Sequence, residues 1–134
     1  MTREEKQILL RDLCGRSLYG VKGLHRGKVH ELFIIDGREV NSACIQVDGY
    51  DAWFPVETFK PYLRPLSSMT EEEKKEFQAC HCVYELHPDF QPMMCNLANE
   101  LNMFNWLNAH HFDYRGLIPM GLALEAPEGM YKNE

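Results

Sequence analysis

The spacing of the apolar residues changes in the middle of the chain, between Pro65 and Glu73. Before this segment, apolar residues form short runs separated by Asp-Gly and Arg-Gly pairs, which is typical of strands joined by turns. After it, they recur at the three- and four-residue spacing of helices. Thr70 and Glu73 fit a capping box, in which each side chain hydrogen-bonds a backbone N–H at a helix start. The pattern therefore predicts a strand-rich half followed by a helical half.

A further helix is predicted at the beginning of the chain, because Thr2 and Glu5 form a second capping box. We expect this helix to span about 3–14. Its apolar side carries three leucines, Leu9, Leu10 and Leu13. Gly15 suits the left-handed conformation that often ends a helix.

Four antiparallel strands are predicted after this helix, at about 18–24, 29–35, 38–47 and 50–56. Arg26-Gly27 marks the first turn, while Asp36-Gly37 and Asp48-Gly49 signal two-residue hairpin turns, because glycine accepts the positive φ that such turns require. These turns set the register. They place Ile35 opposite Arg38, Val47 opposite Tyr50, and Cys44 opposite Trp53.

Alternation along these strands sorts the side chains onto two faces of the sheet. One face would carry Leu32, Ile34, Ala43, Ile45, Val47, Tyr50, Ala52 and Phe54. The other would carry Val29, Phe33, Ile35, Val40, Cys44 and Trp53. Because both faces are apolar, we expect a small four-stranded meander that curls toward a barrel around one face, with the C-terminal helices covering the other. A bulge of one residue would exchange the two faces.

The second half is predicted to contain helices at about 71–84, 92–110 and 115–122. A short helical turn within 55–65 would close the sheet, and 125–134 would form a loose tail. The long helix carries an apolar stripe formed by Met93, Leu97, Leu101, Phe104 and Leu107. We therefore expect a longer amphipathic helix in this half, flanked by two shorter ones.

The whole chain, 1–134, is expected to form a single α+β domain. A half of about 65 residues would bury too little surface to be stable alone, whereas the full length buries roughly two-thirds of its unfolded surface. The first helix with the strands (1–66) and the helical half (67–134) should therefore share one core.

The composition indicates which kinds of partner and which cellular compartment to expect. The net charge of −6 makes binding to a nucleic-acid backbone unlikely. Five cysteines, an odd number, and the absence of an apolar signal segment after the charged start favour reduced thiols in a cytoplasmic protein. No apolar run approaches the ~20 residues of a membrane-spanning helix. The common phosphate-loop, dinucleotide, zincin and hydrolase motifs are absent, so we expect no cofactor and no enzymatic activity.

Cysteine and histidine are concentrated between positions 80 and 95. The residues are Cys80, His81, Cys82, His87 and Cys95. Thiolate and imidazole are zinc ligands, but this spacing is not that of a structural zinc site. On a helix, Cys80 and Cys82 would point about 200° apart. We therefore expect structural, reduced cysteines without a bound metal, and the alternative is a small metal- or thiol-dependent enzyme.

A polar segment from His110 to Arg115 combines imidazoles, a carboxylate and a guanidinium. Such groups serve acid–base or phosphate chemistry when several segments converge on them. The structural alternative is that the histidines complement a helix C-terminus while Asp113 and Arg115 fix a chain reversal at Gly116. In that case Arg115 would donate to Asp113 or to helix carbonyl oxygens.

Aromatic residues between positions 50 and 62 form the third candidate. These aromatic side chains either pack in the core or line a groove that binds a peptide. The complete set of candidate binding residues is Tyr50, Trp53, Tyr62, His110, His111, Asp113 and Arg115. No residue is assigned a catalytic role.

Several blocks of sequence carry a family resemblance. They are LRDLC at 10–14, YGV at 19–21, KPYLRPLSSMTEEE at 60–73, DYRGLI at 113–118 and GLA at 121–123. Together they resemble a family of small uncharacterised proteins encoded by prophages and mobile elements of anaerobic gut bacteria. The resemblance implies a bacterial or phage cytoplasmic setting and an accessory role, but no activity.

From these observations we expect a non-enzymatic accessory protein that binds an unidentified protein partner. Two alternatives stay open. One is a metal- or thiol-dependent enzyme that uses the cysteine-rich helical half. The other is a nucleic-acid-binding accessory protein, which the negative charge disfavours.

Overall fold

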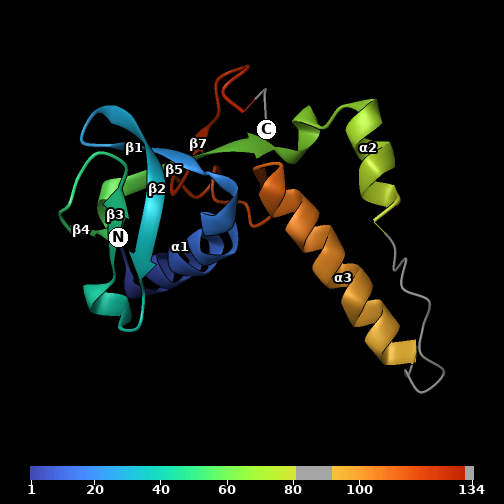
Figure 1. Ribbon diagram of the computed structural model, residues 1–134, viewed down its shortest axis with the longest axis horizontal. Coiled ribbons are helices and arrows are strands. Elements are labelled where there is room, and N and C mark those ends of the chain that lie inside the picture. Colours follow the sequence, from blue (N-terminus) through green and yellow to red (C-terminus); the bar gives the residue numbers. More distant parts are fainter. Residues whose placement is uncertain (81–91, 132–134) are drawn as a thin grey trace.

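The computed structural model describes residues 1–80 and 92–131, which form an α+β fold with one open, mixed sheet (Figure 1). The helices are α1 (Arg3–Arg16), α2 (Glu71–Gln78) and α3 (Pro92–Ala109). The strands are β1 (Lys22–His25), β2 (Lys28–Asp36), β3 (Cys44–Val47), β4 (Phe54–Pro55), β5 (Phe59–Pro65), β6 (Phe112–Asp113) and β7 (Leu124–Glu125). α1 packs against the sheet, while α2 and α3 lie to one side of it (Figure 1).

Both predicted capping boxes are confirmed. Thr2 Oγ1 accepts a hydrogen bond from the Glu5 backbone N–H, and Thr70 Oγ1 accepts one from the Glu73 N–H, each at 3.1 Å. The prediction that Gly15 ends the first helix is wrong, because α1 continues through it to Arg16. A Cβ at Gly15 would lie 3.1 Å from the side-chain amide nitrogen of Asn108, so this glycine lets α3 approach α1.

The sheet is larger than the predicted four-stranded meander, and it does not close into a barrel. Its strand order is β4-β3-β2-β1-β5-β6, and β7 also pairs with β5. Residues 59–65, predicted as part of a helical turn, form β5, which pairs antiparallel with β1 and parallel with β6 and β7. This strand was not predicted because Pro61 and Pro65 are residues typical of turns. Its alternation is nevertheless that of a strand, since Phe59, Pro61 and Leu63 are buried.

One of the three predicted turns is confirmed. Arg26 and Gly27 have positive φ angles of 50° and 81° and join β1 directly to β2. The Asp36-Gly37 hairpin prediction is wrong, because the connection to β3 runs over 37–43 and contains a short 3₁₀ helix. After Asp48-Gly49 the chain also forms a longer loop, and Cys44 pairs with Pro55 instead of Trp53. The Asp-Gly pairs in these two loops have the sequence signature of tight turns. The length of each loop, however, depends on how the flanking strands pack in the fold, which the pair alone does not determine.

A bulge in β2 changes which side chains lie on each face of the sheet, so the predicted faces are partly wrong. Leu32 pairs with Val47, but Ile35 pairs with Ile45, so one extra residue is inserted between them. Ile34 therefore turns toward solvent, and Ile35 turns toward the core. Most of the first predicted face is the buried inner face of the sheet, but Tyr50 and Ala52 are also exposed, because they lie in the loop between β3 and β4. The buried members of this face are Leu32, Ala43, Ile45, Val47 and Phe54.

The inner face is covered by α1 and by the segment 117–123 instead of closing on itself as the predicted barrel. Leu9, Leu10 and Leu13 of α1 belong to the same core cluster as Leu117, Leu122 and Ala123. The predicted helix at 115–122 is a series of turns. α3 begins and ends close to where it was predicted, but it packs through its C-terminal end and leaves Leu101 62% exposed. α3 extends away from the sheet (Figure 1).

Candidate functional site

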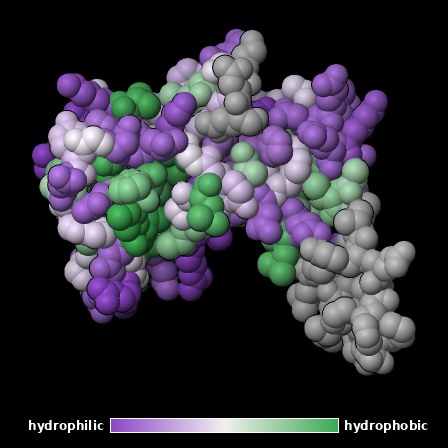
Figure 2. All heavy atoms as spheres, viewed as in Figure 1, coloured by the Kyte–Doolittle hydropathy of each residue, from purple (hydrophilic) through white to green (hydrophobic). Residues whose placement is uncertain are grey.

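The second predicted face of the sheet is uncovered, except that two of its predicted members, Ile35 and Val40, pack against the core. We call the apolar residues on this side the outer sheet face. They are Leu24, Val29, Phe33, Ile34, Cys44 and Trp53. Phe33 is 66% exposed, Val29 51% and Trp53 48%. Figure 2 shows a hydrophobic patch at the position that β2 has in Figure 1.

Strand alternation positions these side chains. Val29 is paired with Leu24, and its neighbours along β2 on the same side are Glu31 and Phe33. The β2 bulge adds Ile34 to the outer side. Trp53 precedes the inward-facing Phe54 and so turns outward. Lys22 pairs with Glu31 and Lys60 with Leu24, so charged groups border the apolar residues on the β1 and β5 side.

The edges of the sheet offer little room for strand addition. β4, at one edge, and β6 and β7, beyond β5, have two residues each. A partner strand therefore finds few unpaired backbone groups along these edges. A partner that uses this sheet must pack onto its outer face.

The structure separates the three predicted aromatic residues. Trp53 lies on the outer sheet face. Tyr50 is half-exposed and packs edge-on against His30 and Phe54, with ring centroids 5.4 and 6.0 Å apart. Tyr62 is half-buried in β5, where its carbonyl oxygen accepts a 2.7 Å hydrogen bond from the Tyr131 hydroxyl.

Sequence reasoning missed Val29 and Phe33 as site residues. Both were placed on a face together with Trp53, but that face was expected to lie under helices. The sequence did contain a signal for an exposed apolar face, because both predicted faces of the sheet are apolar. A single sheet that is covered on one side only leaves the apolar side chains of its other side exposed.

The two predicted histidines are held by aromatic packing. The His110 ring stacks on Trp106 at 4.0 Å, and its Nδ1 lies 2.9 Å from the Trp106 carbonyl oxygen. His111 is buried, has a φ of 65°, and stacks on Tyr131 at 3.6 Å. Tyr131 also accepts a hydrogen bond from the Lys22 backbone N–H at 2.9 Å, so the predicted loose tail is fixed to β1. These contacts give the histidines a structural setting.

Asp113 has the predicted structural role. Its two carboxylate oxygens accept hydrogen bonds from the backbone N–H groups of Leu117 and Ile118, each at 2.9 Å. The carboxylate therefore orders the turn that carries Leu117 into the core.

The predicted partners of Arg115 are wrong. Its Nε lies 3.3 Å from Oδ1 of Asp12, a buried residue of α1. Asp12 also accepts hydrogen bonds from Arg16 Nε at 2.7 Å and Arg16 Nη2 at 3.0 Å. Arg16 Nη2 further donates to the Phe112 carbonyl oxygen at 2.7 Å. The fully buried Asp12–Arg16 pair thus ties α1 to β6. The sequence did not reveal it, because ion pairs at this helical spacing are commonly exposed.

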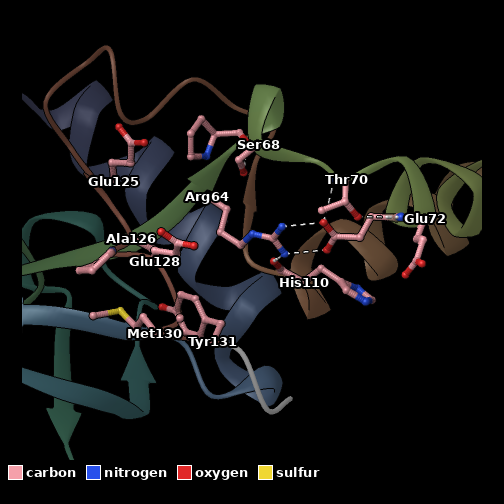
Figure 3. Close-up of a pocket in the computed structure, with 14 residues that line it drawn as sticks. Arg64, Ser68, Thr70, Glu72, His110, Glu125, Ala126, Glu128, Met130 and Tyr131 are labelled. Carbon is pink, nitrogen blue, oxygen red and sulfur yellow. Dashed lines mark hydrogen bonds and ion pairs between the residues drawn. The ribbon is translucent and has the colours of Figure 1, made fainter.

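A cleft of about 820 Å³ lies beside β5, between the start of α2 and the segment 125–131 (Figure 3). Arg64 donates to both carboxylate oxygens of Glu73 at 2.8 and 2.7 Å, and this pairing lowers the pKa of Glu73 to about 2. Glu72, Glu125 and Glu128 also line the cleft. The paired groups connect β5 to α2, and an acidic lining alone does not define a ligand.

The cysteine-rich segment is described only in part. Cys80 is a half-buried free thiol that donates to the Glu76 carbonyl oxygen at 3.3 Å. His81, Cys82 and His87 lie outside the described residues, as does the side chain of Cys95. Within 1–80 and 92–131, no three His, Cys, Asp or Glu side chains are grouped to hold a metal ion. The prediction about this cluster therefore stays a prediction.

Comparison with known proteins finds no matching family model, no similar curated protein and no similar solved structure. Over the described parts of the chain, no helix combines the length and apolar character needed to cross a bilayer.

Proposed function

We propose that this chain is a non-enzymatic protein-binding module that receives an apolar surface of a partner protein on its outer sheet face. The observation that carries the proposal is the exposure of Val29, Phe33 and Trp53 on one side of the sheet. Exposed apolar side chains gathered on one face among charged groups are typical of protein interfaces, in which aromatic residues supply much of the binding energy. The family resemblance supports an accessory role in a prophage or mobile element.

The experiment compares two single substitutions. Phe33→Asp places a charge at the centre of the outer sheet face. Leu101→Asp is the matched control, because Leu101 is 62% exposed on α3, which extends away from the sheet (Figure 1). Both variants should retain the wild-type melting temperature, since neither side chain is buried.

We expect a specific protein from a gut-bacterial host lysate to be retained by the wild type and by Leu101→Asp but lost with Phe33→Asp. The purified partner should then bind the wild type at least about tenfold more tightly than Phe33→Asp, since burial of a large side chain contributes about 1.5–3 kcal/mol. Equal binding of both variants contradicts the proposal. Sedimentation with phosphatidylglycerol vesicles that depends on Phe33 also contradicts it, because it identifies a lipid surface as the ligand.

A further inference from the structure

A second concave region lies beside α1, away from the outer sheet face. Its volume is about 500 Å³. Polar groups of Gln7, Arg11, Cys14 and Arg115 line it, and Leu10 and Val40 add apolar surface. Gln7, Arg11 and Cys14 are spaced four and three residues apart, so one side of α1 presents all three side chains.

Positive charge is in excess at this concavity. The Asp12 carboxylate is shared by Arg16 and Arg115, and the buried Arg16 makes the two shorter contacts with it. Within the described residues, no carboxylate forms an ion pair with Arg11. Arg11 and Arg115 thus line the concavity, and the one carboxylate beside Arg115 is already paired with the buried Arg16, in a protein whose net charge is −6.

The remaining side chains do not cancel this excess. Partial desolvation raises the pKa of the Cys14 thiol, although the residue is exposed, so this group stays neutral at pH 7 and is not a counterion for Arg11. The guanidinium of Arg115 contacts Asp12 through Nε, and its side chain is 35% exposed at the concavity. Planar guanidinium groups match the geometry of oxyanions and donate paired hydrogen bonds to them.

We propose that this concavity binds the phosphate group of a small phosphate monoester. Arg11 and Arg115 would bind the dianion, the Gln7 amide would donate to a further oxygen, and Leu10 with Val40 would contact the organic part of the ligand. Two excess positive charges match the charge of a phosphate monoester near neutral pH. A carboxylate, with one charge and two oxygens, matches this site less well.

The test measures binding to the full chain by titration with inorganic phosphate, phenyl phosphate and benzoate at constant ionic strength. Phenyl phosphate should bind most tightly, because it combines the dianion with an apolar body. Arg11→Gln should weaken it by about tenfold, the effect of losing one charge-assisted hydrogen bond. Arg3→Gln, which removes the same charge from α1 outside the concavity, should leave the affinity unchanged. Arg11 has no ion-pair partner in the described residues, so Arg11→Gln should keep the wild-type melting temperature.

Alkylation by neutral iodoacetamide gives an independent readout. Phenyl phosphate should slow the reaction of Cys14, which lines the concavity, and leave the rate at Cys44 on the outer sheet face unchanged. Equal affinity of Arg11→Gln and the wild type overturns the proposal. Benzoate binding as tightly as phenyl phosphate, or equal protection of both cysteines, also overturns it, because either result shows non-selective binding.

Discussion

The two sides of the sheet have similar side chains and opposite environments. Ile45 and Val47 on the inner side are fully buried, whereas Val29 and Phe33 on the outer side are half-exposed or more. The inner side is covered because α1 and the segment 117–123 pack on it. Whether a strand residue is buried therefore depends on the element that packs over that side of the sheet. The apolar character of the strand alone shows only that its side chains could be buried.

The largest effect should come from removing the cover of the inner side. A chain that ends at residue 66 lacks Leu117, Leu122 and Ala123, together with the Phe112 carbonyl oxygen that accepts from Arg16. Leu63 and the inner strands would then be exposed to water, and we expect aggregation or loss of cooperative unfolding. Proton NMR dispersion checks this, and a well-dispersed spectrum from the fragment would show that the first half folds alone.

Two phenylalanines on opposite sides of the sheet give a direct test of the comparison. Phe59 in β5 is fully buried, and a Cβ at Gly23 would lie only 2.3 Å from its ring, so the ring occupies the space above β1. Phe59→Ala should lower the free energy of unfolding by about 3–5 kcal/mol. Phe33→Ala should change it by less than about 0.5 kcal/mol, since the side chain is exposed. Urea denaturation measures both, and equal losses would mean that the outer side is covered after all.

Local signals in the sequence predicted local structure well. The capping boxes at Thr2 and Thr70 and the turn at Arg26-Gly27 depend only on nearby residues, and all three are present. The start of α3 at Pro92 was predicted for the same reason. Propensity and capping act within one or two turns, so a single sequence contains the information they need.

Features that depend on distant partners were not predictable. The β2 bulge next to Phe33 reflects pairing with β3, and β5 was hidden because its prolines resemble turn residues. The candidate site depends on these features, since the bulge adds Ile34 to the outer sheet face. The partner of Arg115 was missed because Asp12 and Arg115 are 115 − 12 = 103 residues apart along the chain, and no local pattern connects them.

A smaller effect is expected from Arg115→Ala. Its contact with Asp12 is 3.3 Å long and partly exposed, while Arg16 keeps the carboxylate paired. The loss of stability should therefore stay below about 1 kcal/mol, the range of partly exposed ion pairs. Arg16→Ala is the contrasting variant, because it leaves Asp12 buried without its main partner, at a cost of about 3–5 kcal/mol. Thermal denaturation of both variants checks this order, and a larger loss in Arg115→Ala would identify Arg115 as the structural partner.

The smallest effect concerns a buried polar group on the inner side. His25 pairs with Phe59 across β1 and β5, is 2% exposed, and packs on the Phe54 ring with centroids 4.4 Å apart. Burial lowers the pKa of His25 below its ordinary value of 6.5, and the nearby Arg26 acts in the same direction. The unfolded chain therefore binds a proton at this residue more readily than the folded protein does.

The sign of the pH dependence follows from this difference. The stability that neutral His25 provides is present above pH 6.5 and is lost as the pH falls from that value through the lower pKa of the folded state. Urea denaturation at pH 7.5 and 5.5 should show a loss of stability in the wild type and a smaller loss in His25→Gln. An equal loss in both proteins would show that the charge of His25 does not contribute to the pH dependence.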